Sequence, residues 1–376
     1  MCALLFALLP LGLVLLPETA AQDTAVAAKP VPVPWIEHEF LMPAPGAPSG
    51  IDVLKVEVNR TGKHPLALLT HGSATNPIER SQVTPWNYMP QAIWFARRGY
   101  VVLVVVRKGY GRSSGEQDVT HGNCQTSLGR SFADSGEESA SDLRAAINYA
   151  ESLPEVDTGT IVSAGVSSGG FAQVALTVNP PPGLKAAISF AGGRGSDGSL
   201  HNCNESGILS AFHNFGMKSR VPMLWIYAEN DHWFPPELAR RFDVAFREGG
   251  GIEDFVMVPP YLDEGHHFFG DVTGWSPIVE QFLKEKGLLP LPKLLPEPAV
   301  PNVPPPSGLS SPGLAAFHNF LMYGPQKAFA TNGRGGWGMA VGMFSQELAD
   351  KRALDSCAIR ANNIGVCAIV SRGASK

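Results

Sequence analysis

The sequence has little charge and no clusters of one sign. Charged residues make up 17% of its 376 residues, the formal net charge is −5, and no run of lysine or arginine interrupts it. We therefore expect no nucleic-acid partner, because contacts to phosphates need a basic surface. Beyond the first residues no apolar run is long enough to cross a bilayer, so no membrane span is expected in the mature chain.

Cysteine is also scarce, and the first of the five cysteines lies in an apolar N-terminal run. This run, "MCALLFALLPLGLVLLPETAAQD", ends in small residues near Ala21, which is typical of a cleaved secretory signal over residues 1–21. A membrane anchor is the competing interpretation, but the run is short and is interrupted at Pro10. We expect a secreted or periplasmic protein in which four cysteines remain and form two disulfides.

The four remaining cysteines fall into two groups along the chain. Cys357 and Cys367 are close together near the C-terminus, so we expect them to pair, which leaves Cys124 to pair with Cys203. Zinc binding is the alternative, because a histidine stands near each cysteine of the second pair. Paired C-x-x-C spacing is missing, and we therefore favour disulfides and expect no metal and no cofactor.

Proline is concentrated in two segments that divide the chain. Residues 22–49 are rich in proline and alanine and are predicted to form an extended lead-in. Residues 288–313 are predicted to form a semi-rigid linker, because proline fixes φ and has no N–H to donate. The main domain then covers residues 50–287, and a small C-terminal module covers residues 314–376.

Strand-like and helix-like segments alternate through the main domain. The continuous run "YVVLVVV" (100–106) is typical of a strand buried on both faces, and residues 132–153 carry apolar side chains at helical spacing. Further segments of both kinds follow in turn as far as "SPIVEQFLKEKG" (276–287). This alternation predicts an α/β fold with a mostly parallel sheet that is flanked by helices.

Two serines stand in the pattern G-x-S-x-G of nucleophilic serines, and their surroundings differ. Ser167 lies between the strand-like "TIVSAG" and the helix-like "GFAQVALTV", and a strand, sharp turn and helix together expose a nucleophile. Glycine two residues before and two after the serine would avoid collision between the strand and the helix. Ser113 is followed by the polar "GEQDVTHGNCQTS" without helical spacing. We assign Ser167 as the candidate nucleophile and interpret the Ser113 segment as a loop.

A nucleophilic serine needs a base, and the base needs an orienting acid. Asp231 comes just after the strand-like "MLWIYA", and His266 comes after the last predicted strand. The order serine, acid, histidine is the one expected for this type of sheet. Glu229 remains the alternative acid and His267 the alternative base.

Backbone N–H groups near Ser167 can complete an oxyanion hole. We assign these donors to Ser168, which follows the nucleophile, and to Ser73, which follows the strand in "LALLTHGSA". His71 is expected to brace that loop. Residues 191–221 are predicted to form a small cap, and Trp225 and Trp233 are candidates for lining the pocket, although tryptophan is more often a core residue.

The motifs "THGSA", "RKGYGRSSG", "GVSSGG", "YAENDHWFP" and "GHHFF", in this order over residues 50–287, resemble the α/β-hydrolase superfamily. The likeness is greatest to its dienelactone hydrolase-like and prolyl-oligopeptidase-like branch. In the related enzymes the last motif reads G-H-G-F with the histidine as base, which favours His266. Dienelactone hydrolases use a cysteine nucleophile, so their substrate is not implied here. We also expect no propeller-gated oligopeptidase, because residues 1–49 do not read as a β-propeller.

The resemblance implies a serine hydrolase that acts on small-molecule carboxylic esters. A serine exopeptidase that cleaves short peptides is the first alternative, and a catalytically silent binding protein on the same scaffold is the second. The tail resembles small exported bacterial modules of unknown role and is expected to be an α+β unit that could bind a cell-envelope ligand. In it, Ser345 is expected to cap a helix, and "NGRGGWG" is expected to form a hairpin.

Overall fold

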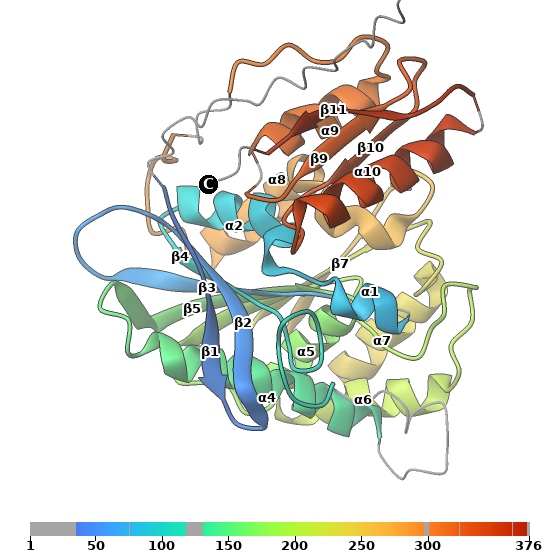
Figure 1. The fold of residues 1–376 in the computed structure, drawn as a ribbon. Helices are drawn as coiled ribbons and strands as arrows, with labels where there is room; N and C mark the ends of the chain where they lie inside the picture. Colours follow the sequence, from blue (N-terminus) through green and yellow to red (C-terminus); the bar gives the residue numbers. More distant parts are fainter. Residues whose placement is uncertain are drawn as a thin grey trace, which may run out of the picture.

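A computed structural model describes residues 35–74, 76–117, 131–296, 301–322, 324–362 and 364–373 (Figure 1). The expected signal segment, residues 1–21, lies outside this part of the chain, and so does Cys124. Within the described residues no helix combines the length and the apolar character that a bilayer crossing requires.

The main domain is built on one sheet, for which the described residues provide eight strands in the order β1-β2-β4-β3-β5-β6-β7-β8. The first pairs, β1 with β2 and β2 with β4, are antiparallel, and the pairs from β4 to β8 are parallel. The α/β sheet expected from the sequence is therefore confirmed. Its strands are β1 (Trp35–Ala44), β2 (Ala47–Val58), β3 (His64–Thr70), β4 (Val101–Val105), β5 (Val156–Val166), β6 (Leu184–Phe190), β7 (Met223–Ala228) and β8 (Glu253–Val258).

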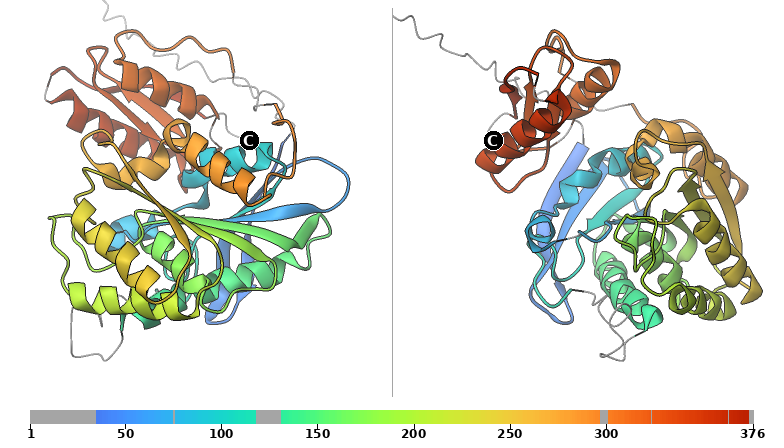
Figure 2. Two further views of the ribbon diagram at one scale, coloured as in Figure 1. Left: turned by 180° about the vertical axis from the view of Figure 1, so that it is seen from behind. Right: turned by 90° about the vertical axis from the view of Figure 1, so that its right-hand side faces the viewer.

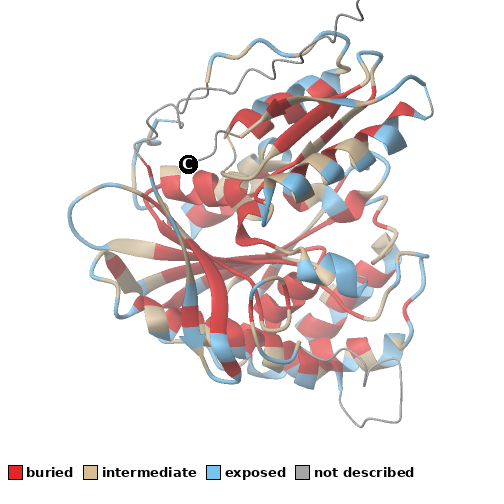
Figure 3. Cartoon of the chain, in the orientation of Figure 1, coloured by how far each residue is buried: buried red, intermediate tan, exposed pale blue. Residues whose placement is uncertain are grey.

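Helices cover both faces of this sheet and bury its aliphatic side chains in two clusters (Figures 1 and 3). One cluster contains α4 (Phe132–Ala150), α5 (Ser168–Leu176), α6 (Glu205–Lys218) and α7 (Pro236–Glu248). The other contains the 3-10 turn η1 (Pro85–Tyr88) with α2 (Met89–Arg97) and α8 (Val272–Glu285). The short elements α1 (Pro77–Ser81) and η3 (Gly265–Gly270) lie in the connections that follow β3 and β8.

The first strand lies where the sequence predicted an extended lead-in. Residues 35–44 form β1, which pairs with β2 along its whole length and joins the main sheet. Within the described residues the sheet thus begins at Trp35 and not near residue 50. The prediction overlooked the alternation of buried and exposed side chains in "WIEHEFLM", because the nearby prolines dominated the composition.

The proline-rich segment after α8 lies against the main domain. Arg97 at the end of α2 donates to the carbonyl of Leu295 and accepts from its N–H, at 2.9 and 2.8 Å. Leu288 is buried in the same core cluster as α2 and α8. These contacts hold the linker along one side of the sheet domain, and helix α9 (Ser311–Met322) begins slightly before the predicted end of the linker.

The C-terminal module is a small α+β unit beside the main domain (Figure 2). Its antiparallel sheet has the order β10-β9-β11, and the loop between β9 and β10 forms the expected hairpin. Ser345 caps α10 as predicted, by accepting from the N–H of Leu348. The elements are α9, β9 (Ala328–Thr331), β10 (Trp337–Ala340), α10 (Gln346–Ala361) and β11 (Ala368–Arg372).

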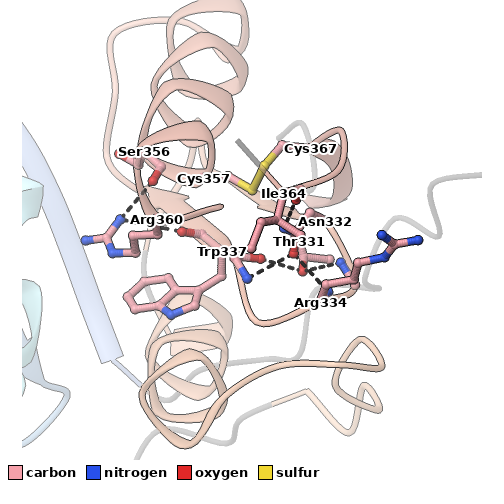
Figure 4. The surroundings of a disulfide bond; sticks show 11 residues. Thr331, Asn332, Arg334, Trp337, Ser356, Cys357, Arg360, Ile364 and Cys367 are labelled. Atoms are coloured by element: carbon pink, nitrogen blue, oxygen red, sulfur yellow. Dashed lines mark hydrogen bonds between the residues drawn. A yellow bond between two sulfur atoms is a disulfide. The ribbon is translucent and has the colours of Figure 1, made fainter. Parts of the chain in front are cut away.

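A disulfide joins Cys357 of α10 to Cys367 at the start of β11, as the sequence predicted (Figure 4). Ala349, Ala353 and Cys357 share the buried face of the helix. Beside the bond, the guanidinium of Arg360 lies 4.3 Å from the ring centre of Trp337. A covalent link suits a module whose two apolar clusters are small compared with those of the main sheet.

Candidate active site

The three residues proposed as nucleophile, acid and base lie after β5, β7 and β8, which belong to one continuous parallel part of the sheet. The carboxyl ends of parallel strands meet at one edge, so the fold brings loops that are distant in sequence to a common place. Ser167 stands at the junction of β5 and α5, Asp231 follows β7, and His266 lies in η3 after β8.

Ser167 occupies a sharp turn between strand and helix. Its backbone has φ 56° and ψ −123°, a left-handed conformation that is strained for a residue with a side chain. The carbonyl of Ser167 accepts from the N–H of Phe171 at 2.9 Å, and helix α5 thus starts directly after the serine. The Ser167 side chain is thereby held at the tip of the turn.

Two glycines make this turn sterically possible. A Cβ atom on Gly165 would lie 2.5 Å from the carbonyl oxygen of Gly169, and one on Gly169 would lie 2.3 Å from that of His71. The expected collision between strand and helix is confirmed for Gly165, whereas Gly169 avoids a collision with the residues at the end of β3. No larger residue fits either position without movement of the backbone.

Asp231 and His266 form a buried hydrogen-bonded pair. The Nδ1 atom of His266 lies 3.0 Å from Oδ2 of Asp231, and only 1% of the Asp231 surface is exposed. The second carboxylate oxygen accepts from the backbone N–H groups of Trp233 and Phe234, at 2.8 and 2.9 Å. These bonds fix the carboxylate toward the imidazole, whereas Glu229, the alternative acid, is exposed.

Glu264 braces the loops that carry this pair, a role the sequence analysis did not assign. Its Oε1 atom accepts from the backbone N–H of His266 at 2.9 Å and of His232 at 3.1 Å. Partial burial opposes ionisation of Glu264, but these hydrogen bonds and the His232 ring lower its pKa overall. The carboxylate therefore ties the loop after β7 to the loop after β8. The sequence gave no signal for this link, because His232 is 32 positions away from Glu264.

The imidazole of His266 lies between aromatic rings. Its ring centre is 5.3 Å from that of Trp233, in a stacked arrangement, and 5.5 Å from that of Phe234. Both aromatic residues also line the pocket in front of Ser167. His267, the alternative base, is exposed, whereas His266 is hydrogen-bonded to the acid Asp231.

A pocket of about 480 Å³ opens in front of Ser167. The loop after β6 forms one wall, but the segment 191–221 is not a cap throughout as the sequence predicted, because its second half forms α6 and packs in the core of the main domain. Trp233 lines the pocket, while Trp225 is fully buried in the core beneath it. The lining residues are Ser73, Ala74, Ser167, Ser168, Gly193, Arg194, Gly195, Ser196, Asp197, His201, Cys203, Trp233 and Phe234.

The candidate oxyanion donors lie on both sides of Ser167. Ser168 opens helix α5, whose N-terminus favours negative charge. The loop after β3 approaches from the other side, since a Cβ on Gly72 would lie 3.0 Å from the Cβ of Ser167. The hydroxyl of Ser73 donates to the hydroxyl of Ser168 at 2.8 Å, and this bond links the two donor segments.

Arg107 supports both segments from beneath and was not identified from the sequence. It is fully buried, and its Nη2 atom donates to the Ser168 hydroxyl at 2.8 Å. Its Nη1 atom donates to the carbonyl of His71 and to the hydroxyl of Thr70. One guanidinium therefore fixes the end of β3 relative to the start of α5.

His71 braces its loop as expected. Its Nε2 atom accepts from the backbone N–H of Arg107 at 2.9 Å, so the ring proton is on Nδ1, which lies 2.6 Å from the carbonyl of Gly72. Because both ring nitrogens are engaged locally, His71 is not available as a base.

Ser113 lies in a buried loop and makes structural hydrogen bonds. Its hydroxyl donates to the carbonyl of Val106 at 2.6 Å and accepts from the N–H of Asp52 at 2.8 Å. The segment after it begins no helix within the described residues up to position 117. The second G-x-S-x-G match therefore lacks the geometry of a nucleophile.

A larger hollow of about 580 Å³ lies at the opposite edge of the sheet. Its lining includes Thr158 and Gly159 near the start of β5 and Gly183 just before β6. In open α/β sheets ligands bind outside the carboxyl ends of the strands. We therefore place the functional site at the smaller pocket, which contains Ser167.

The predicted disulfide of the main domain is only partly described. Cys203 is disulfide-bonded and lines the pocket. Its expected partner, Cys124, lies outside the described residues, so this pairing stays a prediction.

Comparison with known proteins agrees with the fold. The family model of X-Pro dipeptidyl-peptidase (S15 family) matches residues 50–233, somewhat less than half of the chain. No curated protein matches in sequence. Among solved structures, a dipeptidyl aminopeptidase IV-like protein from Bacteroides ovatus is 16% identical with a TM-score of 0.50, over 66% of this chain and 36% of that one.

Two esterases are similar in structure as well. An esterase from Pyrococcus furiosus is 14% identical with a TM-score of 0.46, over 69% of this chain and 95% of that one. An esterase from Thermogutta terrifontis is 19% identical with a TM-score of 0.44, over 66% and 97%.

At such low identity a structural likeness speaks for the fold alone. The strand order, the strand–turn–helix junction at Ser167 and the family match over the main domain agree at that level. The chain therefore has the α/β-hydrolase fold.

Proposed function

We propose that the protein is a secreted or periplasmic serine hydrolase whose preferred substrates are small carboxylic esters. The observation that carries this proposal is the Asp231–His266 pair, whose imidazole lies against two aromatic residues, Trp233 and Phe234, that line the pocket containing Ser167. A buried carboxylate that holds Nδ1 of an imidazole leaves Nε2 to accept a proton from a serine hydroxyl. Export rests on the N-terminal sequence and the disulfides.

The reaction follows from the positions of these groups. Ser167 attacks the ester carbonyl while His266 takes the hydroxyl proton, and Asp231 stabilises the resulting imidazolium. The N–H groups of Ser168 and Ser73 bind the developing oxyanion. His266 then protonates the leaving alcohol, and water, activated by the same imidazole, releases the acid from the acyl-enzyme.

Peptide cleavage is the second candidate, and the family match over residues 50–233 favours it. The same three residues serve both reactions. The described pocket, however, presents a single carboxylate, that of Asp197, for a substrate's charged amino terminus. We therefore rank esters first.

The test compares two substrates on one enzyme. The purified protein should hydrolyse 4-nitrophenyl butyrate with a kcat/KM at least a hundredfold above that for a dipeptidyl 4-nitroanilide with proline in the second position. Ser167→Ala should abolish both reactions. Preferred cleavage of the anilide would replace the ester assignment by the peptidase assignment, and full activity of Ser167→Ala would refute both.

A further inference from the structure

A groove lies beside the active-site pocket, between the main domain and the C-terminal module. It has a volume of about 360 Å³. One wall comes from the connection after β3, including α1 and η1, and the other comes from β10, the turn after it and α10. The lining includes Glu79 and Gln82 on the first wall and Met339, Met343 and Arg352 on the second.

This groove and the catalytic pocket share a lining residue. Ala74 lines both hollows, and it directly follows Ser73, the candidate oxyanion donor. An ester carbonyl held at Ser73 and Ser168 has two substituents, the acyl chain and the alcohol part, which point in different directions. When the acyl chain occupies the pocket, the leaving group can pass Ala74 and enter the groove.

The module wall is held firmly against the main domain. Trp86 packs so closely on the module that a Cβ on Gly324 would lie 2.3 Å from its ring, and one on Gly342 would lie 2.0 Å from the Cβ of Trp86. The indole N–H of Trp86 donates to Glu39 of β1 at 2.7 Å, which fixes the ring. The close packing around Trp86 therefore holds the two walls of the groove together.

Arg352 gives the groove its charge. It is half-buried and, within the described part of the chain, makes no ion pair, whereas its neighbour Lys351 pairs with Asp355 at 2.6 Å. Glu79 on the facing wall is exposed to solvent. Water screens an exposed charge more than a half-buried one, so the guanidinium is the less screened of these two charges.

We propose that the groove is a subsite for a leaving group that carries a carboxylate. Arg352 binds the carboxylate, for which its planar fork is suited, and the thioether side chains of Met339 and Met343 contact the apolar part. The inference rests on the proposed hydrolase function for its place in the reaction. It also assigns the C-terminal module a role in substrate selection.

The first experiment measures binding without turnover, so that it does not depend on the proposed function. The full chain with Ser167→Ala is titrated in a calorimeter with 3-butyryloxy-4-nitrobenzoate and with 2-nitrophenyl butyrate, which lacks only the carboxylate. The anionic ester should bind more tightly. Adding Arg352→Gln should lower the ratio of the two affinities about tenfold, the effect of losing one charge-assisted contact.

Lys351→Gln is the matched control, because it removes the same charge one residue away on the same helix. It should leave the ratio unchanged, and Glu79→Gln should raise it. Equal affinity for both esters, no effect of Arg352→Gln, or an equal effect of Lys351→Gln would overturn the proposal.

A second readout uses the active enzyme. The ratio of kcat/KM for the anionic ester to that for the neutral ester should fall about tenfold in Arg352→Gln, through KM, when the contact lies in the groove. An unchanged ratio would contradict the subsite. If neither ester is hydrolysed, the proposed function is refuted. The binding titration still shows whether the groove binds the carboxylate.

Discussion

The same five-residue pattern occurs twice in this chain, and the two copies have opposite surroundings. Around Ser167 the backbone is strained, the pocket opens in front of the residue, and the loops carrying Asp231 and His266 come to the same edge of the sheet. Around Ser113 the hydroxyl is buried and bonded to two backbone groups. The pattern by itself therefore does not identify a nucleophile.

What distinguishes the copies is the element that follows. A helix directly after Ser167 forces the turn to be sharp, and glycines on either side permit the close approach. After Ser113 the chain continues without a helix as far as residue 117, and the serine can turn inward to satisfy the backbone. We therefore propose a catalytic role for Ser167 and a structural one for Ser113, and the following predictions test that difference.

The largest effect is expected at the acid of the Ser167 site. Asp231→Asn should lower kcat for 4-nitrophenyl butyrate by about a thousandfold to ten-thousandfold, because an amide does not hold the imidazole in the reactive tautomer. Near-ultraviolet circular dichroism should show an unchanged fold. Glu229→Gln is the control at the alternative acid and should retain activity.

A smaller effect is expected at Arg107. Arg107→Lys keeps a cation but loses the fork that holds the Ser168 hydroxyl and the His71 carbonyl. We expect kcat to fall about tenfold to a hundredfold with little change in KM, because the oxyanion donors act mainly in the transition state. Rates should be normalised to the fraction of protein that reacts with a fluorophosphonate. A change confined to KM would contradict this positioning role.

Ser113→Ala should affect stability and leave the reaction intact. The substitution leaves the N–H of Asp52 and the carbonyl of Val106 without their partner, which costs about 1–3 kcal/mol in the free energy of unfolding. Urea unfolding measures this loss, and kcat/KM should stay within about twofold of the native value. A hundredfold loss of activity in a folded variant would contradict the structural role of Ser113.

The Ser113 region should also make stability depend on pH through Asp52. Burial, together with the nearby charge of Glu39, raises the pKa of Asp52 from 3.8 to about 7. Between these values the unfolded chain releases a proton that the folded chain retains. The free energy of unfolding contributed by this group therefore falls as pH rises from about 4 to about 7. Asp52→Asn should remove that decline, as measured by urea unfolding at several pH values.

Much of this comparison was predictable from the sequence. The βα alternation predicted the parallel sheet, and the strand–turn–helix context selected Ser167 over Ser113. Chain order pointed to Asp231 and His266, which the structure brings together. These features have local signals, because each depends on the segment directly around the residue.

Other features had no local signal. Arg107 and Glu264 act through contacts with residues far away in the chain, Ser168 and His232, and Arg352 lines a groove between two distant segments. Arg107 begins the motif "RKGYGRSSG", but the motif does not indicate what its guanidinium contacts. The strand β1 was overlooked because an antiparallel edge strand next to prolines resembles an extended tail in composition. Contacts between segments that are distant in the chain determine these features, and such contacts cannot be recognised from the local sequence.

The nucleophile can be tested most directly by locating a covalent adduct. The native protein, Ser113→Ala and Ser167→Ala should be treated with a fluorophosphonate probe, and the modified residue identified by peptide mass spectrometry. We predict one adduct on Ser167 in the native protein, the same adduct in Ser113→Ala, and none in Ser167→Ala. An adduct on Ser113, or labelling that persists in Ser167→Ala, would contradict the assignment on which the proposed reaction depends.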